Sequence, residues 1–435
     1  MRIELPISVT PDEAFALFGI VIKENATHVC LDSRLAMTND LFFSLADNRH
    51  HITEALEKGA FYAGNRTSLG LLASFVREKL NPSVIAITGS VGKTTAKEYV
   101  YAALSSKIKT HKTSENNNND IGVPISILTM PKDTQALVLE LGSNNPGEIE
   151  YLSGICKPDI AVITSIGTSH IGRFGSQKAI AREKLSILGN TAESGYFIHP
   201  ASLCIPKSFS CRQKEITVGA KGEMCDFAIE SIRLGDVSEY TANGIAVSLP
   251  SRSIHSVTAS AIALAVCEAA GVGIKENFSF ISRVDMPKMR QNIYCRDGIW
   301  FFDDCYNSSL ESTDAALSLM SSIAREKGLR CVVILGDILE CGEYAKKIHE
   351  DTGVLCAKRG VDVLIAYGED SVYTAAAALG EGMGQDKVFF IGGKNHRAVA
   401  DVATSVIRKG DIILFKASRG MECEKIIDYI KEEIY

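Results

Sequence analysis

The chain has 435 residues, 46% hydrophobic and 23% charged, a composition typical of a globular protein with two or three domains. Its formal net charge of −6 argues against general nucleic-acid binding, no apolar run reaches membrane-spanning length, and residues 1–6 lack the apolar core of a signal peptide. The 12 cysteines include no Cys-x-x-Cys pair, which favours reduced thiols over a disulfide framework or a zinc site. We therefore expect a cytoplasmic protein that neither binds nucleic acid nor inserts into a membrane.

The first predicted unit covers residues 1–82 and ends at Asn81-Pro82, a pair typical of a domain boundary. Short apolar segments followed by one helical stretch predict a small α/β domain. The apolar segments lie at 27–31, 41–45 and 60–63, and the helical stretch lies at 68–80.

A phosphate cradle opens the second predicted unit. The apolar run Ser83–Thr88 indicates a buried strand, which breaks at Gly89 and passes Gly92 before a helical pattern begins at Thr94. Glycines allow backbone N–H groups to approach phosphate oxygens, Lys93 supplies a positive charge, and the Thr94 hydroxyl can ligate Mg²⁺. This pattern predicts that the chain binds a nucleoside triphosphate.

The second predicted unit extends from residue 83 to residue 292, and the pattern of its remaining residues predicts a mostly parallel sheet. Strand patterns at 135–141 and 159–166 alternate with helical segments. Short alternating segments around 205–250 indicate a small β-rich insertion, and a long alanine-rich helix at 257–270 closes the unit.

The third predicted unit, residues 293–435, alternates strands and helices strictly, which is typical of a Rossmann-like sheet. The expected fold class is therefore α/β, with three domains. Predicted strands lie at 299–303, 331–335, 363–367, 387–391 and 411–416, and predicted helices lie at 312–327, 344–358, 371–379 and 396–408.

The cradle is shorter than the common nucleotide-binding form, because position 87 is Ile where that form has Gly. Its sequence, Thr-Gly-Ser-Val-Gly-Lys-Thr-Thr, resembles the cradle of the Mur ligase family. Further sequence blocks, which follow in the same order as in that family, resemble the branch that adds D-alanyl-D-alanine. The resemblance covers nearly the whole chain. The blocks are Asp32–Arg34, Asn116–Pro124, Leu139–Ile149, Ile166–Ser176, Ala181–Lys184, Asp303–Asn307, Gly336–Glu340 with His349, and Lys416–Met421.

The resemblance implies an ADP-forming ligase that makes an amide bond in peptidoglycan precursor synthesis. Such an enzyme transfers the γ-phosphoryl group of ATP to a carboxylate, and an amine then attacks the acyl phosphate. The implied substrates are UDP-N-acetylmuramoyl-tripeptide, with its nucleotide-sugar bound by the N-terminal domain, and D-alanyl-D-alanine. The implied cofactors are ATP and two Mg²⁺ ions, and we expect a monomer.

Four residues are candidate metal ligands. Thr94 belongs to the cradle, and Glu140 ends an apolar strand beside it, where a carboxylate favours a metal ligand over a solvated strand end. His170 follows the strand at 159–166, at an edge where ligands bind, and the resemblance implies that it binds a second Mg²⁺. Lys184 by itself indicates an exposed helix lysine, and only the resemblance implies a carbamylated lysine that binds the second metal.

The resemblance also implies nucleotide-binding, catalytic and substrate-binding residues. Two assignments have alternatives: the Asn116–Asn119 run is typical of a polar turn, and the residues after the last strand could form a plain helix entry instead of a carboxylate-binding cluster. The ATP-binding residues are Gly89, Ser90, Val91, Gly92, Lys93, Thr94, Thr95, Asp303 and Asp304. The catalytic residues are Lys93, His170, Lys184 and Arg290. The substrate-binding residues are Ser33, Arg34, Asn118, Asn119, Tyr306, Asn307, Lys416, Ser418 and Arg419.

The sequence departs from the family pattern where substrates bind. Residues 46–53 lack the family's Asp-Gly-His; His50 and His51 could partly replace it or lie at the surface. Residues 308–310 read Ser-Ser-Leu where the branch has Ala-Asn-Pro or Ala-Ser-Pro. A second hypothesis is therefore a paralogous ligase with the same activation chemistry and another acid or amine. A third is a nucleotide-binding regulator, which would need the cradle but would show no amine-dependent turnover.

Overall fold

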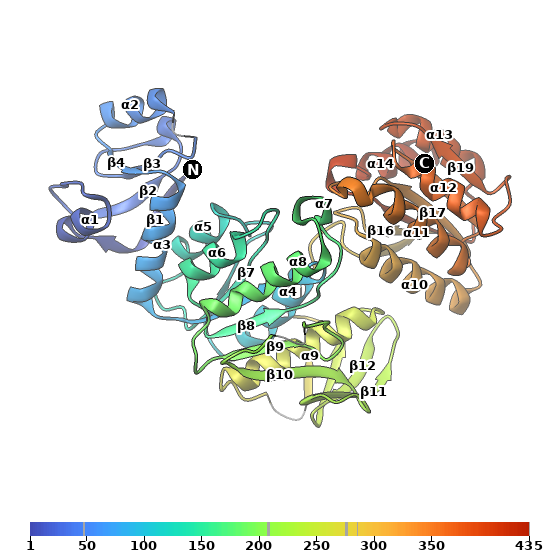
Figure 1. Cartoon of the computed structure of the whole chain (residues 1–435), viewed down its shortest axis with the longest axis horizontal. Helices are drawn as coiled ribbons and strands as arrows, with labels where there is room; N and C mark the ends of the chain where they lie inside the picture. The colour runs from blue at the N-terminus through green and yellow to red at the C-terminus, as the bar shows by residue number, and fades with distance from the viewer. Residues whose placement is uncertain (47, 207–208, 275–276, 285, 435) are drawn as a thin grey trace. The chain divides into compact units, whose positions relative to one another are not determined.

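The computed structural model describes residues 1–434 apart from 47, 207–208, 275–276 and 285 (Figure 1). Contacts within the chain divide it into two compact units. Unit 1 consists of Met1–Ile166 and Ala181–Val284, and unit 2 consists of Gly167–Ile180 and Asp285–Tyr435. Asp47, in the segment that departs from the family pattern, lies outside the described residues. No helix in the described part of the chain has the length and apolar character needed to span a bilayer.

A small α/β domain occupies the start of unit 1. Over the described residues up to Leu80, four strands form a sheet in the order β1-β2-β3-β4, with β1 antiparallel to β2 and the other pairs parallel. Helix α1 begins with a capping box, in which Thr10 and Glu13 bind each other's backbone N–H groups, and with Pro11 in its first turn. The elements are β1 (Arg2–Val9), α1 (Pro11–Phe18), β2 (Ala26–Cys30), η1 (Ser33–Leu35), β3 (Leu41–Phe43), α2 (Arg49–Glu57), β4 (Phe61–Gly64) and α3 (Arg66–Leu80).

The second sheet of unit 1 contains ten strands, counted over the described residues between 83 and 284, in the order β14-β13-β12-β11-β10-β9-β8-β5-β7-β6. All neighbouring pairs from β6 to β11 are parallel. The β-rich segment predicted around 205–250 is present, and its strands extend this sheet. The elements are β5 (Ser83–Thr88), α4 (Lys93–Ser105), β6 (Thr110–Lys112), α5 (Gly122–Leu128), β7 (Ala136–Glu140), α6 (Glu148–Cys156), β8 (Ile160–Ile163), η2 (Ser186–Gly189), β9 (Tyr196–Pro200), β10 (Lys214–Ala220), β11 (Phe227–Arg233), β12 (Ser238–Ala242), β13 (Ile245–Leu249), α9 (Ile254–Ala269) and β14 (Asn277–Ser279).

Strand β5 lies at the centre of the core that positions the cradle. Its residues 84–87 are completely buried, as a parallel strand covered on both faces requires. Helix α3 of the small domain packs against α5 and α6, and its apolar face shares one hydrophobic core with β5. Because β5 lies between β7 and β8, the loops after these three strands leave the same edge of the sheet.

Unit 2 contains a Rossmann-like sheet. Across the described residues 286–434, six strands have the order β15-β16-β20-β17-β18-β19, and only the β15–β16 pair is antiparallel. The short helix α7 (Ile171–Phe174) also belongs to this unit. The domain boundaries at 82 and 292 remain predictions. The elements are β15 (Asn292–Arg296), β16 (Ile299–Asp303), α10 (Leu310–Lys327), β17 (Arg330–Gly336), η3 (Gly342–Tyr344), α11 (Ala345–Lys358), β18 (Val363–Tyr367), α12 (Ser371–Gly380), β19 (Val388–Ile391), α13 (His396–Val406), β20 (Asp411–Lys416), η4 (Arg419–Met421) and α14 (Glu424–Ile434).

Candidate active site

Two glycines shape the phosphate cradle (residues 89–95). Gly89 has a φ of +146° and Gly92 a φ of +86°, and a Cβ added to Gly89 would lie 2.1 Å from Thr164 Oγ1. Gly92 is the N-cap of α4, so the first backbone N–H groups of this helix are directed toward the cradle. Lys93 Nζ donates to Gly89 O at 2.7 Å. The cradle therefore combines backbone N–H groups and an ammonium group, a suitable site for phosphate.

The loop after β8 bonds to the cradle. Thr164 Oγ1 donates to Val91 O at 2.6 Å, and Ser165 Oγ accepts from Val91 N at 2.8 Å. Strand β8 ends at Ile163, three residues before the end predicted from the sequence. The hydroxyl groups that follow it therefore order the cradle.

Glu140 ends β7 beside the cradle strand, where it pairs with Ile87 of β5. It is 2% exposed, Asn118 Nδ2 donates to Oε1 at 3.0 Å, and Oε2 accepts no hydrogen bond from the described residues. A buried carboxylate oxygen normally accepts a hydrogen bond, so the lone pairs of Oε2 are available to a metal ion even with the Lys97 ammonium group 3.8 Å away. The site therefore fits a Mg²⁺ ion held by Glu140 and the buried Thr94.

A fully buried lysine, Lys97, lies next to Glu140 and was not identified from the sequence. Its Nζ is 3.8 Å from Glu140 Oε2 and 3.2 Å from Glu98 Oε1. Lys97 follows Lys93 by four residues on α4, and this spacing places both side chains on one side of the helix. The spacing was the sequence signal that could have identified Lys97 as a residue near the phosphate cradle. Its charge offsets two buried carboxylates.

Lys184 is buried, whereas its local pattern alone predicted an exposed helix lysine. It is 3% exposed on α8 (Gln177–Leu185), and its Nζ donates to Ser143 Oγ at 2.7 Å. Burial, followed by the charge of Lys93, lowers the pKa of Lys184 to about 7, against the opposing effects of Glu183 and Glu148. A large fraction of this amine is therefore neutral near neutral pH, unlike that of an ordinary lysine.

Glu140 and Thr94 would fill only part of the coordination shell of a Mg²⁺ ion. Among the described residues, no three His, Cys, Asp or Glu side chains gather as a metal site. Mg²⁺ is commonly bound through one or two carboxylates together with substrate phosphates, which matches a site built on Glu140 and the cradle.

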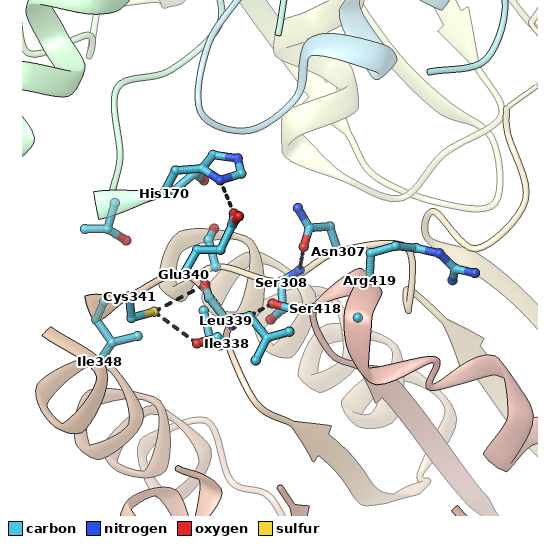
Figure 2. Close-up of a pocket in the computed structure, with 14 residues that line it drawn as sticks. His170, Asn307, Ser308, Ile338, Leu339, Glu340, Cys341, Ile348, Ser418 and Arg419 are labelled. Atoms are coloured by element: carbon cyan, nitrogen blue, oxygen red, sulfur yellow. Dashed lines mark hydrogen bonds and ion pairs between the residues drawn. The ribbon is translucent and has the colours of Figure 1, made fainter. Parts of the chain in front are cut away.

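His170 lies in unit 2 at the N-cap of α7, with a φ of +60°. Its Nδ1 forms a hydrogen bond with the Glu340 carboxylate (Figure 2). Arg173 Nη2 also donates to this carboxylate, at 2.7 Å. Glu340 belongs to a block that resembled the family, but no site role was predicted for it. Because His170 and Glu340 are 170 residues apart, no local pattern connects them.

A cavity of about 330 Å³ lies within unit 2, beyond the carboxyl ends of three parallel strands (Figure 2). The predicted substrate residues Asn307, Ser418 and Arg419 line it, together with His170. Ligands bind outside the carboxyl ends of strands in open α/β sheets, so this cavity is a candidate binding site. Its walls are residues 168–170, 307–309 after β16, 338–341 with Ile348 after β17, and 418–420 after β20.

A buried ion pair supports one wall of this cavity. Lys416, 2% exposed, donates to Asp304 Oδ2 at 2.6 Å and to Asn307 O at 3.1 Å. Asp303 accepts a hydrogen bond from Cys305 Sγ at 2.8 Å, and burial raises the pKa of Asp303. Lys416 therefore fixes the loop that carries Asn307.

Other predicted residues of unit 2 also form internal contacts. The Arg290 guanidinium lies 4.0 Å from the centroid of the Tyr306 ring, a cation–π arrangement. Ser418 Oγ accepts from Leu339 N at 2.9 Å, and Arg419 Nη2 is 2.7 Å from the Glu424 carboxylate. The structure thus brings Asn307, Ser418 and Arg419 to one cavity and stacks Arg290 on Tyr306.

The predicted substrate residues Ser33, Arg34 and Asn119 lie in unit 1. Ser33 Oγ donates to Glu54 Oε2 at 2.6 Å, and Arg34 forms an ion pair with Asp32. Asn119 Oδ1 accepts from the backbone N–H of Gly122, the first residue of α5, at 2.9 Å. His50 and His51 are exposed on α2. Substrate contacts for these residues stay predictions.

The chain matches one family of enzymes over most of its length. The model of the Mur ligase middle domain matches residues 87–267, and that of the Mur ligase glutamate ligase domain matches residues 289–419. Two relatives are named UDP-N-acetylmuramoyl-tripeptide–D-alanyl-D-alanine ligase. The one from Bacillus subtilis is 33% identical over 368 residues, 83% of this chain and 78% of the relative. The one from Synechocystis is 30% identical over 433 residues, 93% of this chain and 92% of the relative.

Solved structures of similar proteins have the same fold. MurF from Acinetobacter baumannii superposes with a TM-score of 0.85 at 27% identity, covering 99% of this chain and 100% of that one. MurF ligase from Thermotoga maritima, determined in complex with ADP, has a TM-score of 0.79 at 24% identity, covering 93% of this chain and 97% of that one.

Proposed function

We propose that this chain, which belongs to the Mur ligase family, joins D-alanyl-D-alanine to UDP-N-acetylmuramoyl-tripeptide in peptidoglycan precursor synthesis. The chain is an ADP-forming ligase. The structural observation that carries the proposal is the buried Lys184 amine, which has a pKa of about 7 and contacts Ser143 in the loop after Glu140. Such an amine beside a phosphate cradle is suited to become a metal-binding carbamate.

The reaction requires an activated acid, because a carboxylate and an amine do not condense in water. A carboxylate oxygen attacks the γ-phosphorus while the bond from that phosphorus to the β-phosphate oxygen breaks, which yields an acyl phosphate and ADP. The amine nitrogen then attacks the acyl carbon, loses a proton, and phosphate leaves. The cradle N–H groups and Lys93 hold and neutralise the β- and γ-phosphates of ATP.

In this proposal Thr94 and Glu140 would hold one Mg²⁺ ion. The roles of His170 and of carbamylated Lys184 as ligands of a second Mg²⁺ ion stay predictions from the family resemblance. Bound Mg²⁺ supplies positive charge for the reacting phosphate and carboxylate oxygens. The unbonded Oε2 of Glu140 supports the first site. The carbamate forms when neutral Nζ of Lys184 attacks the carbon of CO₂ and releases a proton, which converts a cation into an anionic ligand.

We expect the carbamylated fraction of Lys184 to rise between about pH 6 and about pH 8. Below its pKa of about 7 the amine is an ammonium ion without a lone pair for CO₂, and above this pKa it is neutral. The charged groups that face it are Lys93, which lowers the pKa, and Glu183 and Glu148, which raise it. Carbon NMR of protein equilibrated with ¹³C-bicarbonate should show a carbamate signal that grows with pH and is missing from Lys184→Ala. A signal that persists in Lys184→Ala would contradict the assignment.

The proposal assigns the remaining residues by domain. The cavity of unit 2 supports a role for Asn307, Ser418 and Arg419 in binding the incoming dipeptide. The 12 cysteines, all among the described residues and all free, support a cytoplasmic, reducing location, and the proposed oligomeric state is a monomer. ATP contacts are further assigned to Asp303 and Asp304, and contacts with the phosphates or the acyl phosphate to Arg290. Tyr306 is assigned to the dipeptide, Lys416 to a substrate carboxylate, Ser33 and Arg34 to the nucleotide-sugar, and Asn118 and Asn119 to substrate binding.

Phosphate release by the purified full chain tests the proposal. A mixture of ATP, Mg²⁺, UDP-N-acetylmuramoyl-tripeptide and D-alanyl-D-alanine is expected to release phosphate, and omission of either the acid or the amine is expected to stop it. Release only with other acid–amine pairs would identify the paralogous ligase that the departures at 46–53 and 308–310 suggested. Absence of amine-dependent release with every pair would instead support a nucleotide-binding regulator.

A further inference from the structure

The His170–Glu340 pair has an unusual backbone at both ends. His170 has a φ of +60° and Glu340 a φ of +61°, values in the left-handed region that residues other than glycine rarely adopt. Such conformations persist only where the surrounding structure imposes them, and they concentrate at functional sites. The contacts of their loops must therefore hold both residues in place.

The two segments that carry the pair approach each other at the level of the backbone. Gly172 N donates to Glu340 O at 3.0 Å. A Cβ added to Gly172 would lie 2.5 Å from Gly342 N, and one added to Gly342 would lie 2.8 Å from Gly172 Cα. Only glycine at both positions permits this approach, which brings the Glu340 carboxylate to His170 Nδ1.

The loop that carries Glu340 is anchored on its other side. Ile338 N donates to His349 Nε2 at 3.1 Å, and Leu339 N donates to Ser418 Oγ at 2.9 Å. His349 is itself fixed, because its Nδ1 donates to Ala345 O at 2.8 Å. The backbone preceding Glu340 is therefore held from within unit 2, and the carboxylate has a defined position.

We propose that Glu340 is a positioning residue for His170. Its carboxylate accepts the proton on Nδ1 and fixes the tautomer and orientation of the ring, which places the lone pair of the ring on Nε2, where it would serve a metal ion. Histidine ligands commonly donate their second ring N–H to a carboxylate, which fixes the tautomer and makes the ligating nitrogen more basic. This inference rests on the role of His170 as a metal ligand in the proposed function.

The alternative is that Glu340 only fastens residues 167–175 to the rest of unit 2. Its ion pair with Arg173 joins side chains that are 34% and 47% exposed, and such surface pairs contribute little stability. Other contacts also fasten this segment, including Thr168 N to Glu311 at 2.7 Å and Tyr344 Oη to Gly175 O at 2.8 Å. Attachment of residues 167–175 to the rest of unit 2 therefore does not require a carboxylate at position 340.

Mn²⁺ binding in the presence of a non-hydrolysable ATP analogue, followed by electron paramagnetic resonance, tests the proposal on the full chain. Glu340→Met removes the acceptor and is expected to weaken binding at the His170-dependent site about 10- to 100-fold, with a smaller loss in Glu340→Gln, which keeps an acceptor oxygen. The exposed Glu343→Gln is the matched control and should bind normally. In a His170→Ala background, Glu340→Met should cause no further loss.

Nitrogen NMR of labelled histidines gives a second readout that needs neither metal nor turnover. His170, assigned by its loss in His170→Ala, should show an Nδ1–H tautomer in the wild type and a shifted tautomer equilibrium in Glu340→Met. Glu340→Gly relieves the left-handed backbone and should reproduce the Mn²⁺ defect without a lower melting temperature. Wild-type Mn²⁺ binding and an unchanged His170 spectrum in Glu340→Met would overturn the proposal. Failure of the proposed function would instead appear as wild-type protein that releases no phosphate with any acid–amine pair.

Discussion

Lys184→Ala is expected to slow phosphate release by about 100- to 1,000-fold, the range found when one preorganised charge-stabilising group is removed from an active site. The substitution removes the nitrogen that carries the proposed carbamate. Folding should be retained, because the lost group is a buried amine whose charged form is disfavoured by its surroundings. Steady-state phosphate release and thermal melting of the same preparations measure both effects.

Chemical rescue separates the carbamate from other roles of Lys184. Short carboxylic acids such as acetate should partly restore turnover in Lys184→Ala, because the cavity left by the side chain can admit an anion in place of the carbamate. Lys178→Ala, which removes an exposed lysine from the same helix, should have wild-type activity and no response to acetate. Undiminished turnover in Lys184→Ala would refute the carbamate.

Lys416→Met is expected to destabilise unit 2 by about 3–5 kcal/mol, because it leaves the Asp304 carboxylate buried without its cation. The double variant Lys416→Met/Asp304→Leu should recover much of this loss, since replacement of a buried ion pair by apolar groups is often close to neutral. The large destabilisation by Lys416→Met alone arises because the Asp304 carboxylate would stay buried without a compensating charge. This loss of stability is expected whether or not Lys416 also binds substrate, as predicted.

Urea unfolding followed by the fluorescence of Trp300 measures this effect. Trp300 is the only tryptophan of the chain and lies in β16 of unit 2, so its signal reports on this unit. Lys347→Met is the control, because Lys347 forms an exposed i,i+4 ion pair with Asp351 and should change stability by less than about 0.5 kcal/mol. A loss no larger for Lys416→Met than for Lys347→Met would show that the buried pair does not support the fold.

Parts of the fold with strong local signals were predicted well. The strand predicted at 83–88 is β5, and those predicted at 299–303, 363–367 and 411–416 are β16, β18 and β20 with the same bounds. Buried parallel strands are continuous apolar runs bounded by polar residues and glycine, so their limits can be identified locally.

Elements with weaker or unused signals were missed. Strand β15 pairs antiparallel at the edge of its sheet, and helices α1 and α14 were not predicted. For α1 a signal existed, since Thr10, Pro11 and Glu13 form a capping box with proline in the first turn. A half-exposed edge strand shows no continuous apolar run, so β15 had no comparable signal.

The sequence by itself determined the phosphate cradle, the α/β class and the family, because these depend on short motifs and local periodicity. Only the tertiary structure showed that Lys184 is buried against Ser143 and has a pKa of about 7, since the neighbours that desolvate it come from other segments. It also placed Lys97 beside Glu140 and Glu340 on His170, contacts between residues 43 and 170 positions apart. Burial and charge at a site depend on such long-range neighbours, which no local pattern contains.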